Sequence, residues 1–196
     1  MINYKSEISK EELAELPMIA FQGDIICVDK EEDIKEAVEY LKQFEILGFD
    51  TETKPSFKKG VSNNVCLLQL STEERAYLFR LHITGFTDEI KYLLESDDIR
   101  KVGVGVHEDI VGLNKLRKFK HRNFFELQTF AKSFGIENIS LKKLCGIVLD
   151  STISKRQQVS NWEKEDLTPA QQRYAATDAW TSLKIHDTLR ANYYLD

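Results

Sequence analysis

The sequence predicts an α/β protein in which helices flank a mixed sheet. Short apolar runs bounded by polar residues predict strands, and longer segments with apolar residues at every third or fourth position predict amphipathic helices. These elements follow one another as a β-hairpin and then as strand–helix units, an order typical of α/β folds. The 196 residues are 42% hydrophobic, enough for the core of one globular domain.

In the first half of the chain, segment 6–16 is rich in acidic residues. Ser9 can cap a short helix there, which we expect to be a solvated face or a frayed arm. The apolar positions of Lys30–Phe44 recur with helical spacing. Four apolar runs predict strands: Asp24–Asp29, Glu45–Asp50, Val65–Leu70 and Arg75–Leu81. The polar residues Ser71–Glu74 join the last two runs as a hairpin.

The second half alternates strands and helices. Ile99–Val106 and Asn123–Leu127 are predicted strands. Helices are predicted over Thr87–Glu95, from His107 to Leu116, over Leu127–Phe134, after Ser140, and from Pro169 to about Tyr193. The polar stretch Leu149–Leu167 between the last two helices stays unassigned.

The charge is unevenly distributed along the chain. The net charge is −5, but residues 1–48 carry 5 basic and 12 acidic side chains, and the remainder carries 22 basic and 20 acidic ones. A net negative charge is unfavourable for binding nucleic acid, yet here the acidic excess lies upstream of Asp50 and the motifs described below. We predict an acidic N-terminal extension, residues 1–22, followed by one domain, residues 23–196.

The cysteines and the apolar runs indicate the compartment. Three cysteines, widely spaced and odd in number, do not form a disulfide framework, so we expect an intracellular, cytoplasmic protein in a reducing compartment. The N-terminus has no apolar segment typical of a secretory signal, and no apolar run is long enough for a membrane span. We therefore expect no membrane partner, whereas the oligomeric state is not indicated.

The first candidate site motif is Asp50-Thr51-Glu52, at the end of a predicted strand. Residues two apart on a strand point to one face, so two carboxylates would repel each other unless a cation neutralises them. A strand end running into a polar loop also explains these residue types. On this motif alone, metal binding and the ordinary loop end are about equally well supported.

Two further acidic positions strengthen the metal interpretation. Asp109 follows a predicted buried strand at the start of a helix, where it could equally be an ordinary helix cap, and His107 and Glu108 compete with it for any role. Tyr174 and Asp178 lie one turn apart on one face of the last helix. Together the four carboxylates carry a charge of −4, which two divalent cations would balance, and oxygen ligands favour Mg²⁺ or Mn²⁺.

In order and spacing, these motifs resemble the DEDD superfamily of 3′→5′ exonucleases in its tyrosine-bearing DEDDy branch. The nearest group contains ribonuclease D and the exonuclease domain of the Werner syndrome protein. The resemblance extends from about Cys27 to Leu189. It rests on the segments Gly48–Phe57, Leu68–Leu70, Lys101–Gly105, Ser160–Trp162, Leu167–Gln171 and Tyr174–Ala179.

The resemblance implies a ribonuclease H-like fold with a five-stranded mixed sheet. It also implies that Asp50, Glu52, Asp109 and Asp178 bind two divalent cations and that Tyr174 orients the attacking water. Asp50 would bridge both ions, Glu52 and Asp178 would complete the first site, and Asp109 would serve the second, partly through water. The same five residues are the expected catalytic residues.

We predict a metal-dependent 3′-5′ exonuclease that releases nucleoside monophosphates from the 3′ end of nucleic acid, by a two-metal mechanism. DNA is the favoured substrate, because the sequence contains no accessory helical domain of the ribonuclease D type after the last predicted helix. The alternatives are a ribonuclease D-like enzyme that trims RNA 3′ ends and a non-catalytic nucleic-acid-binding module.

Four residues are predicted to contact the substrate. Lys54 and Lys58 follow the first motif and could bind phosphate, and Phe57 between them could stack on a terminal base. Lys155 lies in the polar stretch before Trp162, where it could bind phosphate or be merely exposed. The basic run Lys115–Arg122 is either a solubilising face or a phosphate contact.

Overall fold

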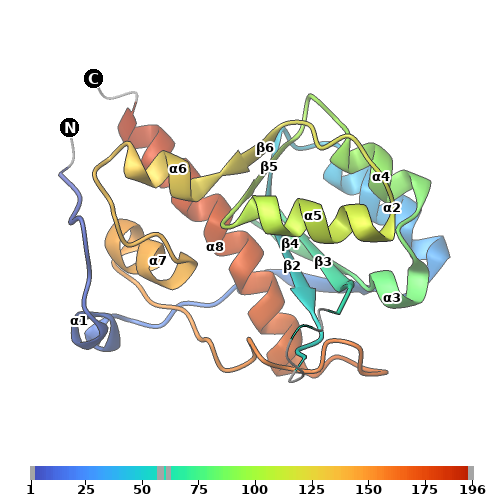
Figure 1. Ribbon diagram of the computed structural model, residues 1–196, viewed down its shortest axis with the longest axis horizontal. Helices are drawn as coiled ribbons and strands as arrows, with labels where there is room; N and C mark the ends of the chain where they lie inside the picture. Colours follow the sequence, from blue (N-terminus) through green and yellow to red (C-terminus); the bar gives the residue numbers. More distant parts are fainter. Residues whose placement is uncertain (1–2, 57–59, 61–62, 194–196) are drawn as a thin grey trace.

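The computed structural model describes residues 3–56, 60 and 63–193 and contains one central six-stranded sheet (Figure 1). The six apolar runs predicted as strands all form strands, one more than the family resemblance implies. The strands are β1 (Asp24–Val28), β2 (Ile46–Thr53), β3 (Val65–Ser71), β4 (Arg75–Phe79), β5 (Arg100–Gly103) and β6 (Phe124–Glu126). The α/β class is confirmed, and the strand count is corrected from five to six.

The sheet is mixed, with strand order β1-β4-β3-β2-β5-β6. β2, β3 and β4 pair antiparallel, as the predicted hairpin requires. β1 joins β4, and β5 and β6 extend the sheet beyond β2, all by parallel pairing. The central strand β2 thus has a parallel neighbour on one side and an antiparallel neighbour on the other.

Helices cover both faces of this sheet (Figure 1). They are α1 (Lys10–Glu15), α2 (Glu31–Leu41), α3 (Leu81–Thr84), α4 (Asp88–Leu94), α5 (Val106–Leu116), α6 (Leu127–Lys132), α7 (Leu141–Leu149) and α8 (Pro169–Tyr193). α5 lies on one face of the sheet and α8 crosses the other, where it contacts β1 to β5. No helix in the described part of the chain is long and apolar enough to span a membrane.

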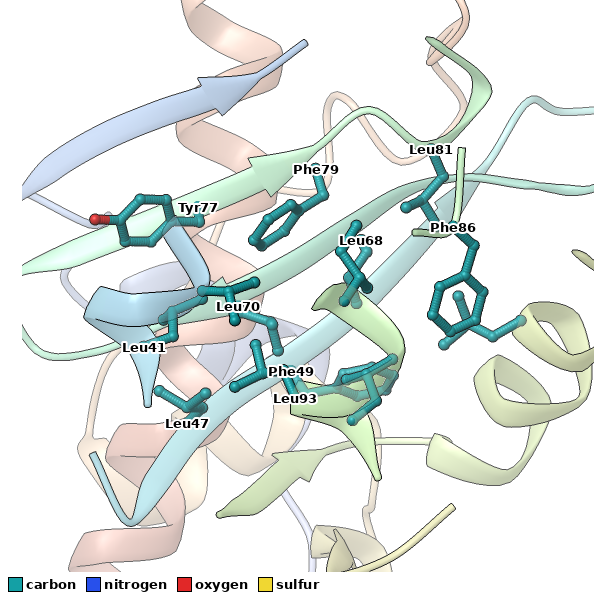
Figure 2. Close-up of a cluster of buried hydrophobic side chains, with 14 of the residues drawn as sticks. Leu41, Leu47, Phe49, Leu68, Leu70, Tyr77, Phe79, Leu81, Phe86 and Leu93 are labelled. Carbon is teal, nitrogen blue, oxygen red and sulfur yellow. The ribbon is translucent and has the colours of Figure 1, made fainter. Parts of the chain in front are cut away.

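The main hydrophobic core lies between the sheet and helices α2, α4 and α5 (Figure 2). Phe49 and Leu47 of β2 point into it, together with Leu68 and Leu70 of β3, and all four side chains are buried. Because side chains alternate along a strand, Asp50 points to the opposite face. The apolar residues of β2 therefore fix the direction of its carboxylates.

Helix α8 lies unusually close to β2 because small residues separate them. A Cβ atom on Gly48 would lie 2.0 Å from the carbonyl oxygen of Ala179, so a larger residue would displace the helix. Ala175, Ala176 and Ala179 are fully buried. This close approach places the carboxylate of the neighbouring Asp178 beside the end of β2.

The N-terminal segment packs on the rest of the molecule through a few apolar residues, which corrects the expectation of a frayed arm, whereas most of α1 is a solvated face as expected. Ser9 caps α1 in a capping box with Glu12, as the sequence indicates. Leu13 is buried against Gly146 of α7, and Phe21 is buried beside α8. These few apolar residues in an acidic stretch gave little periodic signal, so the sequence pattern could not predict their packing.

Candidate active site

Strand β2 and helix α8 bring three carboxylates together. Asp50 and Glu52 lie near the end of β2 and point towards α8, where Asp178 is buried beside them. Carboxylate oxygens of the three residues lie within 4.8 Å of one another. The two motifs, more than 120 residues apart in the sequence, therefore form one cluster.

Asp109 approaches this cluster from the opposite side of β2. It lies in the first turn of α5 and is half-buried. The hydroxyl of Thr51 donates a hydrogen bond to its Oδ1 atom, at 2.5 Å. Asp109 is outside the group of three, but its charge is the strongest carboxylate influence on the pKa of Asp50. The four predicted metal ligands thus share one region, with Asp109 at its edge.

Glu126, which the sequence patterns did not single out, holds the start of α5. Its carboxylate accepts hydrogen bonds from the backbone N–H groups of Gly105 and Val106, at 3.1 and 2.8 Å. It also accepts from the N–H of Gln128 at the start of α6, at 3.0 Å. One carboxylate therefore caps two helices and fixes the turn from which Asp109 projects. The available signal was an acidic residue just before a predicted helix.

Tyr174 lies one helical turn before Asp178 and is buried next to it. Its hydroxyl lies near the Asp178 carboxylate and partly offsets the burial that raises the pKa of that carboxyl group. Its ring lies 5.9 Å from the ring of the buried Trp162, centroid to centroid. Trp162 therefore supports Tyr174 and the start of α8 by packing.

The four carboxylates destabilise one another when they are ionised. Removal from water, together with the neighbouring carboxylates, raises the pKa of Asp50 well above its ordinary value and that of Glu52 to about 9. Removal from water also raises the pKa values of Asp109 and Asp178 to about 7. Among the described residues, none of the four forms an ion pair. Clustered oxygen donors with uncompensated negative charge fit hard divalent cations such as Mg²⁺ or Mn²⁺.

Two hollows meet at Thr51 and Glu52. The smaller, about 340 Å³, lies between the end of β2 and helices α7 and α8; Lys155, Gln158 and Gln128 line it. The larger, about 710 Å³, lies beside α5. Its lining includes Lys54, Asn63, His107 and Lys115. The carboxylates thus lie between two depressions, the smaller lined by one lysine and the larger by two.

The predicted substrate residues have different environments. Lys155 lines the smaller hollow, and its charge lowers the pKa of Asp178. Lys54 lines the larger one and forms an ion pair with Glu163, at 3.0 Å. Phe57 and Lys58 lie outside the described residues.

The basic run Lys115–Arg122 does not act as one patch. Arg117 pairs with Asp88 at 2.6 Å, and Arg122 pairs with Asp97 at 2.5 Å. Lys115, by contrast, lines the larger hollow. The structure therefore divides this run into arginines that serve surface ion pairs and a lysine placed near the candidate site.

Gln69 is a second residue that the sequence analysis did not assign. It lies opposite Asp50 in the β2–β3 pairing, so both side chains face α8. Gln69 is fully buried, and its amide atoms have no hydrogen-bond partner among the described protein atoms. The sequence signal for Gln69 is that it is the single polar residue in the apolar run Val65–Leu70.

The sequence profile of the 3′-5′ exonuclease family matches residues 25–193. Among curated proteins, the mouse bifunctional 3′-5′ exonuclease/ATP-dependent helicase WRN is 34% identical over 187 residues. That match covers 89% of this chain but 13% of the mouse protein. The chain therefore spans a small part of the length of this relative.

Solved structures show the same fold. The Nibbler EXO domain of Aedes aegypti has a TM-score of 0.81 and 22% identity, covering 90% of this chain and 93% of that one. The Trypanosoma brucei RNase D complex with RNA U12 has a TM-score of 0.77 and 20% identity, covering 86% and 63%.

Proposed function

The chain belongs to the 3′-5′ exonuclease family, and we propose that within it this protein degrades DNA from the 3′ end to nucleoside monophosphates with two divalent cations. Members of this family are phosphodiester hydrolases that act on nucleic acid. The observation that carries the proposal is the convergence of Asp50, Glu52 and Asp178 within 4.8 Å, with Asp109 beside them.

The carboxylates are the proposed metal ligands. Asp50, Glu52 and Asp178 would hold one cation, and Asp50 and Asp109 would hold the other. When bound, such cations polarise the scissile phosphate and lower the pKa of the attacking water. Removal from water, and after it the neighbouring carboxylates, raise the pKa values of Asp50 and Glu52, and bound cations would offset both costs of ionisation.

Tyr174 is proposed to position the attacking water. Burial and the neighbouring carboxylates raise the pKa of its hydroxyl far above the ordinary value, so the hydroxyl stays protonated at neutral pH. A protonated hydroxyl can donate a hydrogen bond but cannot accept the proton of water as a base. Packing against Trp162 holds its ring at the edge of the cluster.

The two hollows form a proposed path for a nucleic-acid strand. Because they meet at Thr51 and Glu52, a strand that occupies both would cross the carboxylates with its phosphate at the cluster. Lys155 in the smaller hollow, and Lys54 and Lys115 in the larger, are proposed phosphate contacts. Lys54 would exchange Glu163 for a phosphate group when the strand binds.

The preference for DNA rests on the degree of sequence similarity. The chain is 34% identical over 187 residues to the mouse exonuclease/helicase. RNA 3′-end trimming is the second candidate, and the fold shared with that RNA complex favours it. The presence of all four carboxylates and Tyr174 argues against a non-catalytic binding module.

The test uses end-labelled DNA and RNA, single-stranded or with recessed 3′ ends, incubated with Mg²⁺, Mn²⁺ or a chelator. We expect shortening from the 3′ end, faster on DNA, and none in the chelator. Asp178→Ala should abolish turnover while the fold persists, whereas the control Asp98→Ala, at an exposed position, should stay active. Degradation in chelator, cleavage from the 5′ end or an active Asp178→Ala protein would contradict the proposal, and faster turnover of RNA would favour the second candidate.

A further inference from the structure

We infer that Thr51 is a positioning residue that orients the carboxylate of Asp109 for metal binding. The inference rests on the proposed function, because it concerns how the fourth carboxylate joins the metal site. Thr51 lies between two proposed ligands, but it points to the other face of the sheet, so it has no place in the cluster of three.

Among the described residues, the side-chain hydroxyl of Thr51 makes one hydrogen bond, with Asp109, while its backbone N–H donates to Asp50. Strand alternation turns its side chain towards α5, the helix that carries Asp109. The Oγ1–Oδ1 distance of 2.5 Å is that of a short, charge-assisted hydrogen bond. An ionised carboxylate only accepts hydrogen bonds, so the hydroxyl must be the donor.

This bond constrains a side chain that is otherwise weakly held. Within the described part of the chain, Thr51 is the hydrogen-bond donor found for the Asp109 carboxylate. With Oδ1 engaged by the hydroxyl, Oδ2 is left to face a cation or a bound water. Without the bond, the carboxylate could rotate about its side-chain torsions and would bind a cation less well.

The position of α5 itself does not depend on Thr51. Glu126 caps the start of the helix, and Gly112 allows it to pack closely on Val65, where a Cβ atom would meet the valine side chain at 2.6 Å. Valine has nearly the shape of threonine and an equally high strand propensity. Thr51→Val should therefore remove the hydrogen bond and leave the backbone in place.

The experiment compares Thr51→Val, Thr51→Ser and the control Thr188→Val, which removes a hydroxyl on α8 that bonds the Lys184 carbonyl. Calorimetry without nucleic acid measures Mn²⁺ binding, and thermal denaturation in chelator measures the melting temperature. Steady-state kinetics on a labelled nucleic-acid strand give kcat and KM. For Thr51→Val we expect about tenfold weaker binding of one Mn²⁺ ion and a lower kcat with little change in KM, partly recovered at high Mn²⁺. Thr51→Ser, which keeps the hydroxyl, should restore both.

Three outcomes would overturn the inference. Thr51→Val could bind Mn²⁺ and turn over like the wild type, or Thr51→Ser could be as impaired as Thr51→Val. The loss could also track a lower melting temperature in chelator, which would indicate a purely structural role. A wild-type protein that binds no Mn²⁺ would instead overturn the proposed function, and the inference with it.

Discussion

At the residue scale, three consecutive side chains of β2 contact different parts of the site, because side chains alternate between the two faces of a strand. Asp50 and Glu52 face α8 and the carboxylate cluster, while Thr51 faces α5 and holds Asp109. A one-residue shift in the pairing of β2 would exchange these faces and bury the two carboxylates in the apolar core. The buried Phe49, on the same face as Thr51, opposes such a shift.

Tyr174→Phe tests the positioning role of the tyrosine hydroxyl. The substitution keeps the packing against Trp162 and removes only the hydroxyl group near Asp178. Because the raised pKa of Tyr174 keeps the hydroxyl protonated, we expect kcat to fall about tenfold to hundredfold through a misplaced water, with Mn²⁺ affinity retained. Steady-state kinetics and Mn²⁺ calorimetry check this. A loss of Mn²⁺ affinity as large as that of Asp178→Ala would show that Tyr174 serves the metal site instead.

At the element scale, the ends of helices decide where the carboxylates lie. Asp109 depends on the start of α5, and that start depends on Glu126, which lies in another element. Gly105 takes φ of +77° just before the helix, a conformation that glycine adopts without strain. This turn leads directly into the helical turn that carries Asp109.

Glu126→Ala should therefore weaken both the fold and the site. Three backbone N–H groups lose their acceptor, so we expect the free energy of unfolding to fall by about 2 kcal/mol. Urea denaturation measures this loss, and hydrogen exchange should be faster at the amides of Gly105 and Val106. The exposed Glu137, replaced by alanine, is the control. Unchanged exchange at these two amides would contradict the capping role.

Lys101 in β5 makes the free energy of unfolding depend on pH in the alkaline range. Its side chain is fully buried, and its ammonium group donates to the carbonyls of Ser96 and Ile99, at 2.9 and 2.8 Å. Burial lowers its pKa from 10.5 to about 8. The unfolded chain therefore binds the proton more tightly between these two pH values, and stability rises as pH increases from about 8 to 10.5.

Lys101→Met removes this contribution and provides the reference. The difference in unfolding free energy, wild type minus variant, should grow over that pH range by at most about 3 kcal/mol. Urea denaturation at pH 7.5, 9 and 10.5 measures it, and subtraction cancels the titration of tyrosines and cysteines common to both proteins. A difference that is constant or falls with pH would show that the lysine is not held at a depressed pKa.

At the scale of the whole molecule, regular elements could be predicted from the sequence and most side-chain partnerships could not. The strands and long helices have apolar spacing that identifies them locally, whereas the four-residue helix α3 is too short for a periodic signal. Motif order identified the four carboxylates as one set. The contacts of Thr51 with Asp109 and of Lys54 with Glu163 join residues 58 and 109 positions apart, and only the fold brings them together.

The net charge of −5 is distributed unevenly over the folded molecule. The acidic excess of residues 1–48 is carried mainly by residues 29–39 around α2, net −4, and by residues 5–15 around α1, net −2, and neither helix lines the hollows that meet at the carboxylates. The charge that opposes a phosphate backbone is then mainly that of the carboxylate cluster. Nucleic-acid binding should therefore respond to the charge of the cluster far more than to the overall charge.

Two double variants with equal net charge test this point. Asp109→Asn/Asp178→Asn removes two carboxylates of the site, whose pKa values of about 7 leave them ionised at pH 8, and Glu7→Gln/Glu11→Gln removes two exposed carboxylates near α1. In chelator at pH 8, where no turnover occurs, the first variant should bind a labelled single strand about threefold to tenfold more tightly than the wild type, because two charges facing the phosphate are removed. The second should bind like the wild type, since its charges are distant and screened by salt. Fluorescence anisotropy measures both affinities, and equal gains for the two variants would show that overall charge, not the cluster, controls binding.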